Sequence, residues 1–213
     1  MDGNDYLQLA NKYWQDKNFK KALVYFKESA KKGNYIAMYS IACMYFFADG
    51  VKQNYHLAYK WYLKAANNND PEATYRVGLM LENGLGVKQD IVASFQYYLK
   101  SAEMGSLSGM YYLGRCYLAA KGVEKDLSKG LFWLNKAANL GNGIAADFLG
   151  HFYLNDQINK ALKYFRMAID QTYLPSILTV LELVEKQIIT LDVEEIKKLR
   201  TLAEKLKDET FSN

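Results

Sequence analysis

The sequence of 213 residues has only two cysteines, two histidines and two prolines. Its cysteines, Cys43 and Cys116, form neither a CxxC motif nor a cluster with histidine, which argues against a structural metal site and a disulfide framework. A protein with so few cysteines fits a reducing compartment best. We therefore expect a cytoplasmic protein without a bound metal, and secretion by a route that needs no signal peptide stays open.

Long apolar segments are missing as well. The first residues, Met1 to Asp5, are polar and acidic and lack the apolar core of a signal peptide. The longest apolar-looking stretch, Leu174 to Leu191, is too short and too charged to span a bilayer. It is interrupted by Pro175, Glu182, Glu185 and Lys186. We expect no insertion into a membrane.

No charge of one sign dominates the sequence, which has 27 Lys and Arg against 23 Asp and Glu, for a net charge of +4. The basic residues are spread along the chain, whereas nucleic-acid binders usually concentrate them in one patch. Half of the residues are hydrophobic and 23% are charged, which is typical of a folded protein. We expect no binding of nucleic acid.

Internal repetition is the strongest signal in the sequence, and its step is 36 residues. A small residue that follows an aliphatic one recurs at this step, as Ala42, Gly78, Gly114 and Gly150. The same step relates the Gly-Val pairs that begin at Gly50, Gly86 and Gly122. It also relates the polar residues Asn54, Asp90 and Asp126. So many positions that agree in phase indicate a repeat protein.

Each repeat predicts two helices joined by a loop. In the unit that begins at Pro71, the first helix ends at Asn83 and Gly84, because glycine supplies the positive φ that a helix C-cap commonly needs. Asp90 then stands where the second helix needs an N-cap acceptor. A small residue such as Gly78 lets a neighbouring helix approach closely. The recurring aromatic residues are expected to fill the core, and they are Tyr45, Trp61, Tyr97, Tyr117, Trp133, Tyr153 and Tyr164.

We expect one α-solenoid domain over residues 1–213. Three full repeats cover 35–141, and a shorter unit stands on each side of them, at 4–33 and at 142–170. The terminal units of a solenoid are usually atypical, because they must cover a core that would otherwise be exposed.

The last part of the chain, 171–213, predicts two further helices that cap the array. The first begins at Pro175 and ends near Ile188. The beginning of the second helix is marked by Asp192 and Glu195, which have the spacing of a capping box. The second carries an apolar stripe that consists of Val193, Ile196, Leu199, Leu202, Ala203 and Leu206.

The repeated framework resembles a known family. It reads Ala-x-x-x-Ile/Val/Leu-Gly-x-x-Tyr, then Gly-Val-x-x-Asp/Asn, then Trp/Tyr-Tyr/Leu-x-Lys-Ala-Ala, and it is similar to Sel1-like repeats. These are relatives of the tetratricopeptide repeat with a longer loop between the helices. The three units in 35–141 resemble them well, and the units at 4–33 and 142–170 look more like tetratricopeptide repeats.

The resemblance implies an all-α fold, a right-handed α/α superhelix of about five helix-turn-helix repeats followed by C-terminal capping helices. It also implies a surface that binds proteins or peptides on its concave face. We expect no cofactor. One branch of the family is secreted and has a disulfide in every repeat, and this chain departs from it. Cys43 and Cys116 lie two repeats apart, whereas packed helices are about 8–10 Å apart and a disulfide needs Cα atoms within about 4.4–6.8 Å.

Candidates for catalysis are few. Asp147 and His151 are four residues apart on one helical face and could form a pair of a base and the group that orients it, or half of a metal site. No third ligand or nucleophile is identifiable near them in the sequence. Cys43 lacks the histidine and asparagine of a thiol enzyme. We therefore expect no enzyme, and a hydrolase-like enzyme that uses these residues is the alternative.

Candidates for binding lie on the inner face of the first helices. Tyr39, Tyr75 and Tyr111 recur there and are either framework or an aromatic ladder for a ligand. Side chains that do not recur are better candidates, because the framework does not require them, and aromatic residues and arginine often dominate binding energy. The predicted protein-binding residues are Trp14, Tyr39, Phe46, Phe47, Tyr75, Leu79, Glu82, Tyr111, Arg115, Leu118 and His151. Alternatively, Phe46 and Phe47 pack under the loop of their repeat.

The favoured function is a bacterial scaffold or adaptor, expected to be a monomer, that binds another protein or peptide on its concave face. An apolar groove with isolated charges suits an amphipathic helix or an extended peptide. Two other roles stay open, an immunity protein that occludes a bacterial toxin and a factor delivered into a host cell. A nucleic-acid-binding repeat would need basic residues on the concave face, but many lie on second helices, as do Lys60, Lys64, Lys100 and Lys136.

Overall fold

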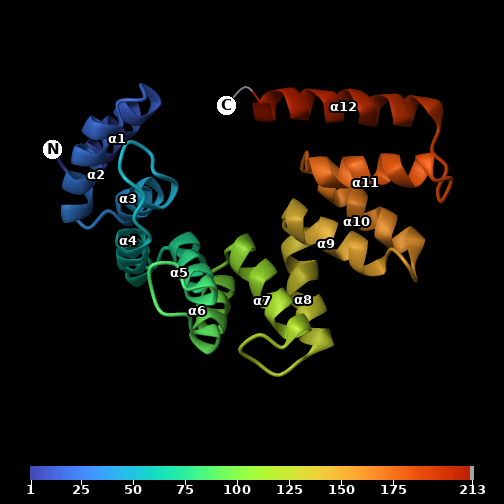
Figure 1. Cartoon of the computed structure of the whole chain (residues 1–213), viewed down its shortest axis with the longest axis horizontal. Helices are drawn as coiled ribbons and strands as arrows, with labels where there is room; N and C mark the ends of the chain where they lie inside the picture. Colours follow the sequence, from blue (N-terminus) through green and yellow to red (C-terminus); the bar gives the residue numbers. More distant parts are fainter. Residues whose placement is uncertain (212–213) are drawn as a thin grey trace. The chain divides into compact units, whose positions relative to one another are not determined.

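The computed structural model describes residues 1–211, and over these residues the chain is α-helical without strands (Figure 1). Successive helices pack against one another in pairs, so the predicted all-α solenoid is confirmed. The chain divides into two compact units, Met1–Leu127 and Ser128–Asn213. That all five repeats and the C-terminal helices form one domain stays a prediction.

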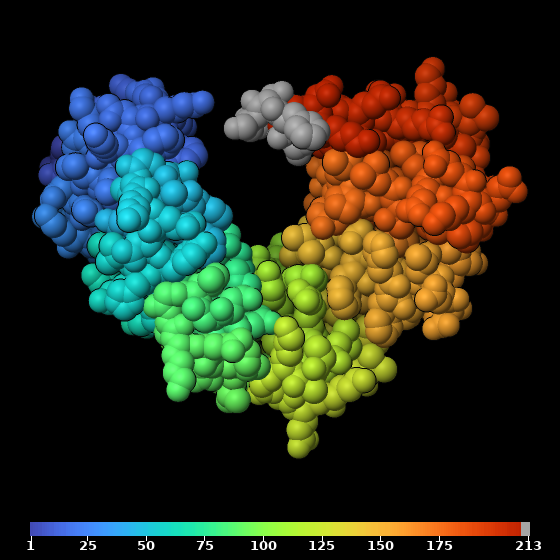
Figure 2. All heavy atoms as spheres, in the orientation of Figure 1, coloured from blue at the N-terminus to red at the C-terminus, as the bar shows by residue number. Residues whose placement is uncertain are grey.

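The first unit, unit 1, contains seven helices. They are α1 (Gly3–Gln15), α2 (Phe19–Lys31), α3 (Tyr35–Phe47), α4 (Tyr55–Asn67), α5 (Pro71–Asn83), α6 (Ile91–Glu103) and α7 (Leu107–Ala119). In a space-filling view, successive segments of this unit form one continuous surface (Figure 2). The odd-numbered helices are the first helices of their repeats, and the even-numbered ones are the second helices.

The second unit, unit 2, continues the series and ends with the two helices expected beyond the repeats. Its helices are α8 (Leu127–Asn139), α9 (Gly143–Tyr153), α10 (Ile158–Asp170), α11 (Leu174–Glu185) and α12 (Val193–Phe211). Pro175 lies in the first turn of α11, as predicted, and α11 ends at Glu185 rather than near Ile188. Within residues 1–211, no helix combines the length and apolarity needed to cross a membrane.

Side chains that cap the helices explain where the helices begin. Asn54 accepts a hydrogen bond from the backbone N–H of Leu57 at 2.9 Å, and Asp90 accepts one from that of Ala93 at 2.8 Å. The predicted N-caps of α4 and α6 are therefore confirmed. The C-cap of α5 is Gly84 with φ +67°, also as predicted, but alanine takes the same left-handed conformation at the end of α3.

Glycine recurs in the Gly-Val loop for a second reason besides its positive φ. Gly86 lies directly on the backbone at the beginning of α4, where a Cβ would overlap Tyr55 and His56. Gly50 and Gly122 contact the beginnings of α2 and α6 in the same way. Each loop therefore packs on the second helix of the preceding repeat, and this contact between repeats requires glycine.

The core of each repeat is built around one large side chain of the second helix. This position is fully or almost fully buried in every repeat, as Phe26, Tyr62, Tyr98, Leu134 and Phe165. The preceding residues Trp61, Tyr97 and Trp133, which are also expected to fill the core, are only half-buried, and Trp61 and Tyr97 pack against its edge. One residue along a helix turns a side chain by about 100°, so the neighbouring aromatic lies beside the core rather than at its centre.

Lysine covers two of these half-buried tryptophans. The Lys64 Nζ lies 4.3 Å from the centroid of the Trp61 ring, and the Lys136 Nζ lies 4.9 Å from that of Trp133. Both lysines follow their tryptophan by three residues, the spacing at which helical side chains meet. Of the other predicted core aromatics, Tyr153 and Tyr164 are buried, and Tyr45 and Tyr117 are half-buried.

Small residues bring each first helix close to its partner. A Cβ at Gly78 would lie 2.9 Å from the Tyr98 ring, and one at Gly150 would lie 2.5 Å from the Phe165 ring. Both distances are too short for a side chain, so the prediction that glycine permits a close approach is confirmed at these two positions. In α12, Leu199 and Ala203 are buried as predicted, but Val193 is 83% exposed and does not belong to the apolar stripe.

Gly150→Ala is expected to destabilise the protein. In an ordinary helix the change from glycine to alanine gains about 1 kcal/mol, but here overpacking against Phe165 costs about 1–3 kcal/mol or more. We expect a net loss in the free energy of unfolding, measured by urea denaturation. Gly143→Ala in the first turn of the same helix is the control, because the nearest atoms there are side-chain carbons at 3.3 Å. Equal effects at both positions would contradict this packing.

Candidate functional site

Ten of the eleven predicted binding residues lie on the first helices of unit 1. Trp14 is on α1; Tyr39, Phe46 and Phe47 are on α3; Tyr75, Leu79 and Glu82 are on α5; Tyr111, Arg115 and Leu118 are on α7. We call the surface on which these residues lie the first-helix face, although Tyr75 itself is buried, with only 7% of its surface exposed. His151 is on α9 in unit 2 and is described separately. That these residues bind a partner stays a prediction.

A pocket of about 240 Å³ opens on the first-helix face between α1 and α3, and we call it the α1–α3 pocket. Its floor is apolar, with Phe26 and Met44 buried in the core beneath it. Its lining residues are Asn11, Trp14, Phe26, Tyr39, Ser40, Cys43, Met44 and Asp49. The Trp14 side chain at its edge is 45% exposed. The pocket therefore combines an apolar base with a partly polar wall.

The Cys43 thiol in this pocket is held by tyrosine. Its Sγ lies 3.3 Å from the hydroxyl of Tyr62, a residue with no exposed surface. Burial raises the pKa of the Cys43 thiol above its ordinary value, so the thiol is protonated at neutral pH. A thiolate is the reactive form of cysteine. Cys116 is free as well, and its burial raises its pKa to about 12.

The two phenylalanines at the end of α3 have different surroundings. The Phe46 ring packs edge-on against Tyr55 and Tyr62, with centroid separations of 5.2 and 6.4 Å. Its carbonyl oxygen accepts a hydrogen bond from the Gln53 side chain in the following loop at 2.9 Å. Phe47 is 54% exposed. The alternative of packing beside the loop therefore describes Phe46, whereas Phe47 is available to a partner.

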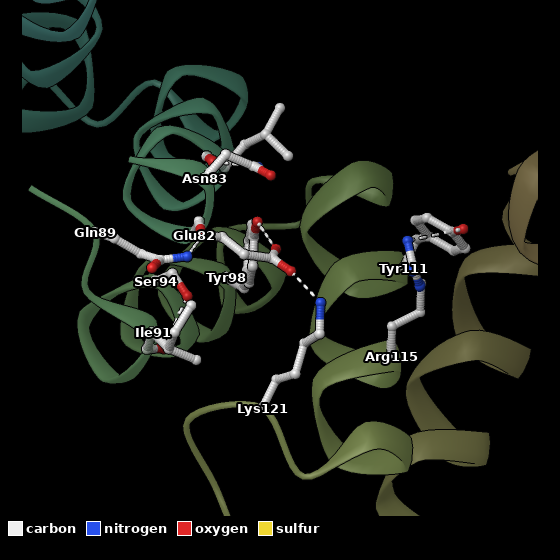
Figure 3. A network of polar contacts seen from close by, with 10 residues as sticks. Glu82, Asn83, Gln89, Ile91, Ser94, Tyr98, Tyr111, Arg115 and Lys121 are labelled. Carbon is white, nitrogen blue, oxygen red and sulfur yellow. Dashed lines mark hydrogen bonds and ion pairs between the residues drawn. The ribbon is translucent and has the colours of Figure 1, made fainter. Parts of the chain in front are cut away.

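Glu82 on α5 is the centre of a polar network (Figure 3). The Tyr98 hydroxyl donates to its Oε2 at 2.7 Å, and the Lys121 Nζ donates to its Oε1 at 2.6 Å. Burial alone would raise the pKa of Glu82, but these two hydrogen bonds and the positive charges of Lys121 and Arg115 outweigh it, so the pKa is lowered. Both carboxylate oxygens are therefore used within the fold.

An arginine on α5 and a tyrosine on α7 also lie on this face, and sequence reasoning missed both. Arg76 Cζ lies 5.0 Å from the centroid of the Tyr75 ring, and that ring stacks on Tyr112 at 5.7 Å. Arg115 Cζ lies 6.0 Å from the same Tyr112 ring and 5.4 Å from that of Tyr111. Position 76 is serine one repeat earlier and tyrosine one repeat later. This change from serine to arginine to tyrosine at one repeat position was the signal in the sequence that could have identified both residues.

In unit 2, His151 and Asp147 lie close together, but the serine beside them does not bond to the histidine as a catalytic nucleophile would. The Ser176 hydroxyl donates to Asp147 Oδ1 at 2.6 Å and ties α9 to α11. His151 Nδ1 lies 3.0 Å from the Asp147 carbonyl oxygen and 3.5 Å from Oδ2. In nucleophilic catalysis the serine would bond to the histidine rather than to the acid. Within residues 1–211, no three His, Cys, Asp or Glu side chains are placed to hold a metal ion.

The charge of Glu82 is expected to stabilise the fold at neutral pH. Because its pKa is lowered by folding, its contribution is present above the ordinary pKa of about 4.3 and is lost as the pH falls through the lowered value. Glu82→Gln keeps an acceptor for Tyr98 but removes the charge that Lys121 binds. We expect it to cost about 1–3 kcal/mol at pH 7, measured by urea denaturation, and little at pH 2.5.

The matched control is Glu28→Gln, which breaks the exposed ion pair between Glu28 and Lys31. Exposed pairs contribute about 0–1 kcal/mol, so this variant should unfold nearly as the unchanged protein does at both pH values. A cost at Glu82 that does not change between pH 7 and pH 2.5 would show that its charge does not stabilise the fold.

Comparisons with known proteins agree with this architecture. A crystal structure of a Sel1 repeat protein from Oxalobacter formigenes is 25% identical, with a TM-score of 0.82, over 96% of this chain and 88% of that one. The protective antigen c5321 of uropathogenic Escherichia coli, which displays the same type of fold, is 26% identical with a TM-score of 0.71. The match covers 98% of this chain but only 47% of c5321.

The immunity protein Pa5087 from Pseudomonas aeruginosa has a TM-score of 0.70 at 18% identity, over 96% of this chain and 86% of that one. At this identity the similarity concerns the fold alone. A search of the curated proteins gave no match.

The family model for the Sel1 repeat matches five segments, 6–34, 36–70, 71–106, 107–142 and 144–173. These segments cover most of the chain and include the two outer units that look more like tetratricopeptide repeats. Proteins of this family are generally binding scaffolds without enzymatic activity. The chain belongs to the Sel1 repeat family.

Proposed function

We propose that this protein is a non-enzymatic scaffold that binds a segment of another protein on the first-helix face. The observation that carries the proposal is the α1–α3 pocket with the exposed ring of Trp14 at its edge. An apolar pocket beside exposed aromatic side chains is typical of the anchor sites that dominate protein–protein interfaces.

The size of the pocket favours a side chain of a protein partner over a complete small ligand. Pockets for small molecules usually have volumes of about 300–1,000 Å³, and this one is about 240 Å³. Tyr39 and Phe46 on α3 both pack on the buried ring of Tyr62 on α4. Phe46 packs in turn on the exposed ring of Phe47. A bound segment can therefore place one side chain in the pocket and continue over Phe47.

An enzyme that uses Cys43, Asp147 or His151 has less support. The Cys43 thiol is partly buried and protonated at neutral pH. Asp147 lies 3.5 Å from His151, but the serine bonded to this pair, Ser176, donates to the acid rather than to the histidine. Neither arrangement provides a nucleophile next to a general base. The non-enzymatic role is therefore the better explanation of both groups.

The biological setting depends on the partner. An adaptor, an immunity protein and a factor delivered into a host cell could all use the same face. A monomeric protein in the cytoplasm stays our prediction, and the two free cysteines agree with a reducing compartment. Neighbouring genes and a pull-down from the native bacterium, followed by mass spectrometry, would identify the partner. Protection of cells that produce a neighbouring toxin would support the immunity role.

Truncation of the aromatic side chains beside the pocket is expected to weaken binding. Trp14→Ala and Phe47→Ala should each reduce the affinity for the purified partner by about 2 kcal/mol if the side chain is a hot spot. Calorimetric titration measures the affinity, and a thermal midpoint that changes little shows that the fold is intact. Leu134→Ala, in the core of unit 2, should instead cost about 2–5 kcal/mol of stability.

The control for these variants is Phe132→Ala, because Phe132 is 60% exposed but lies on the second helix α8. It should bind the partner as the unchanged protein does. If Phe132→Ala abolishes binding while Trp14→Ala and Phe47→Ala bind normally, the interface lies on the second helices and the proposal is wrong.

A further inference from the structure

Two arginines on the first-helix face have no carboxylate partner. Arg76 on α5 and Arg115 on α7 form no ion pair with any carboxylate of the part of the chain that the structure describes. Other arginines do, since Arg166 contacts Glu195 at 3.4 Å and Arg200 contacts Glu185 at 3.7 Å. The nearby carboxylate of Glu82 is not available to the two arginines, because Lys121 and Tyr98 use both of its oxygens.

The two guanidinium groups are held by one stack of tyrosine rings. Arg76 lies on the ring of Tyr75. Arg115 Cζ lies 6.0 Å from the centroid of the Tyr112 ring and 5.4 Å from that of Tyr111, whose hydroxyl accepts a hydrogen bond from Arg115 at 3.5 Å. The rings of Tyr75 and Tyr112 are stacked with an interplanar angle of 16°. We call Arg76, Arg115, Tyr75 and Tyr112 the arginine–tyrosine cluster. Stacking on aromatic rings fixes the plane of a guanidinium group while its N–H donors stay free to bind.

Arg76 is also poorly satisfied by its surroundings. Its Nε is buried and has no hydrogen-bond partner, although the side chain as a whole remains partly exposed. The groups around it include the side chains of Tyr39, Tyr62 and Tyr75, and Tyr39 shares a hydrogen bond with the guanidinium group. These tyrosines hold the arginine in place, but none of them is a counterion, and a partly buried charge without a counterion is unfavourable. A bound anion would supply the missing charge.

From this juxtaposition we propose that the arginine–tyrosine cluster recognises the carboxylates of an acidic protein segment, whose Asp or Glu side chains pair with Arg76 and Arg115. Guanidinium binds carboxylate through two parallel hydrogen bonds, and this geometry makes the pair both strong and specific. The proposal rests on the proposed function, because it names the chemistry of the partner that binds the same face.

The cluster and the α1–α3 pocket are neighbours, so one segment can use both. Tyr39 lines the pocket and also interacts with the Arg76 guanidinium. A partner segment with an apolar side chain for the pocket and acidic residues beyond it would match both features. Nucleic acid is the weaker fit, because it would need a row of basic side chains, whereas Lys60 and Lys100 lie on second helices.

The test is selection of peptides from a random library displayed on phage, with the full chain as bait. We expect the selected sequences to be enriched in Asp and Glu relative to the starting library, and to combine them with a large apolar residue. A synthetic peptide from the selection should lose about tenfold or more in affinity when its acidic residues become Asn or Gln. Its binding should weaken as the salt concentration rises.

Variants of the chain then locate the acidic site. Arg76→Gln with Arg115→Gln should lose the enrichment in Asp and Glu and bind the synthetic peptide about tenfold or more weakly. Lys60→Gln with Lys100→Gln removes the same charge from exposed positions on second helices and should have no effect. Arg76→Lys with Arg115→Lys should restore binding only in part, because lysine keeps the charge but cannot form the bidentate pair.

Stability separates a binding role from a structural one. If Arg76 serves a partner, Arg76→Gln removes an unpaired charge and should leave the thermal midpoint unchanged or raise it. A fall of several degrees would overturn the proposal, because it would show that the fold itself needs this arginine.

The remaining outcomes are also decisive. Selected peptides that depend on Trp14 but show no acidic enrichment would overturn this proposal and leave the proposed function standing. Failure of the Trp14→Ala control to reduce binding would instead count against the first-helix face as a whole. Much tighter binding of a phosphoserine version of the peptide, or of single-stranded RNA, would show that the cluster recognises phosphate and would also overturn the proposal.

Discussion

The fold depends on the contact between a small residue of each first helix and one large side chain of the second helix. Gly78 touches the ring of Tyr98, and Gly150 touches that of Phe165. This contact sets the distance between the helices of a repeat, and it also reaches the surface. The hydroxyl of the fully buried Tyr98 bonds to Glu82 on the first-helix face. The packing of the core therefore positions a polar group of the candidate site.

Much of the fold could be predicted because several features of the sequence keep the same step. The caps Asn54, Asp90 and Gly84 lie at the ends of the helices where their chemistry is needed. Burial of the aromatic residues could not be predicted in the same way. Trp61 and Tyr62 are adjacent and both apolar, and only the neighbouring helices decide that Tyr62 enters the core. The lysine stem of Lys64 then covers the ring that remains outside.

The candidate site was predictable as a face but not as a set of contacts. Helical periodicity places Trp14, Phe47 and Arg115 on first helices, and the structure agrees. Arg76 was missed because its importance depends on neighbours from other repeats, Tyr39 before it and Tyr112 after it. No pattern within a single repeat contains those contacts. The lack of an acidic partner for Arg76 is likewise a property of the three-dimensional arrangement, since the sequence has acidic residues nearby, such as Glu72 and Glu82.

The repeat architecture separates stability from specificity, and position 76 illustrates how. The same place on the first helix holds Ser40 in one repeat, Arg76 in the next and Tyr112 in the one after. The side chain at this position lies against the buried ring of the preceding repeat, since Tyr112 stacks on Tyr98 at 5.1 Å and Arg76 interacts with Tyr62. The small residue contacts the buried ring of its own repeat, as Gly78 does with Tyr98. The first-helix face can therefore differ from repeat to repeat while the contact within each repeat is kept. An apolar pocket at α1 and α3, followed by arginines without a carboxylate partner at α5 and α7, is such a variation. Under the proposed function, it would distinguish partners by the order of apolar and acidic side chains along one bound segment.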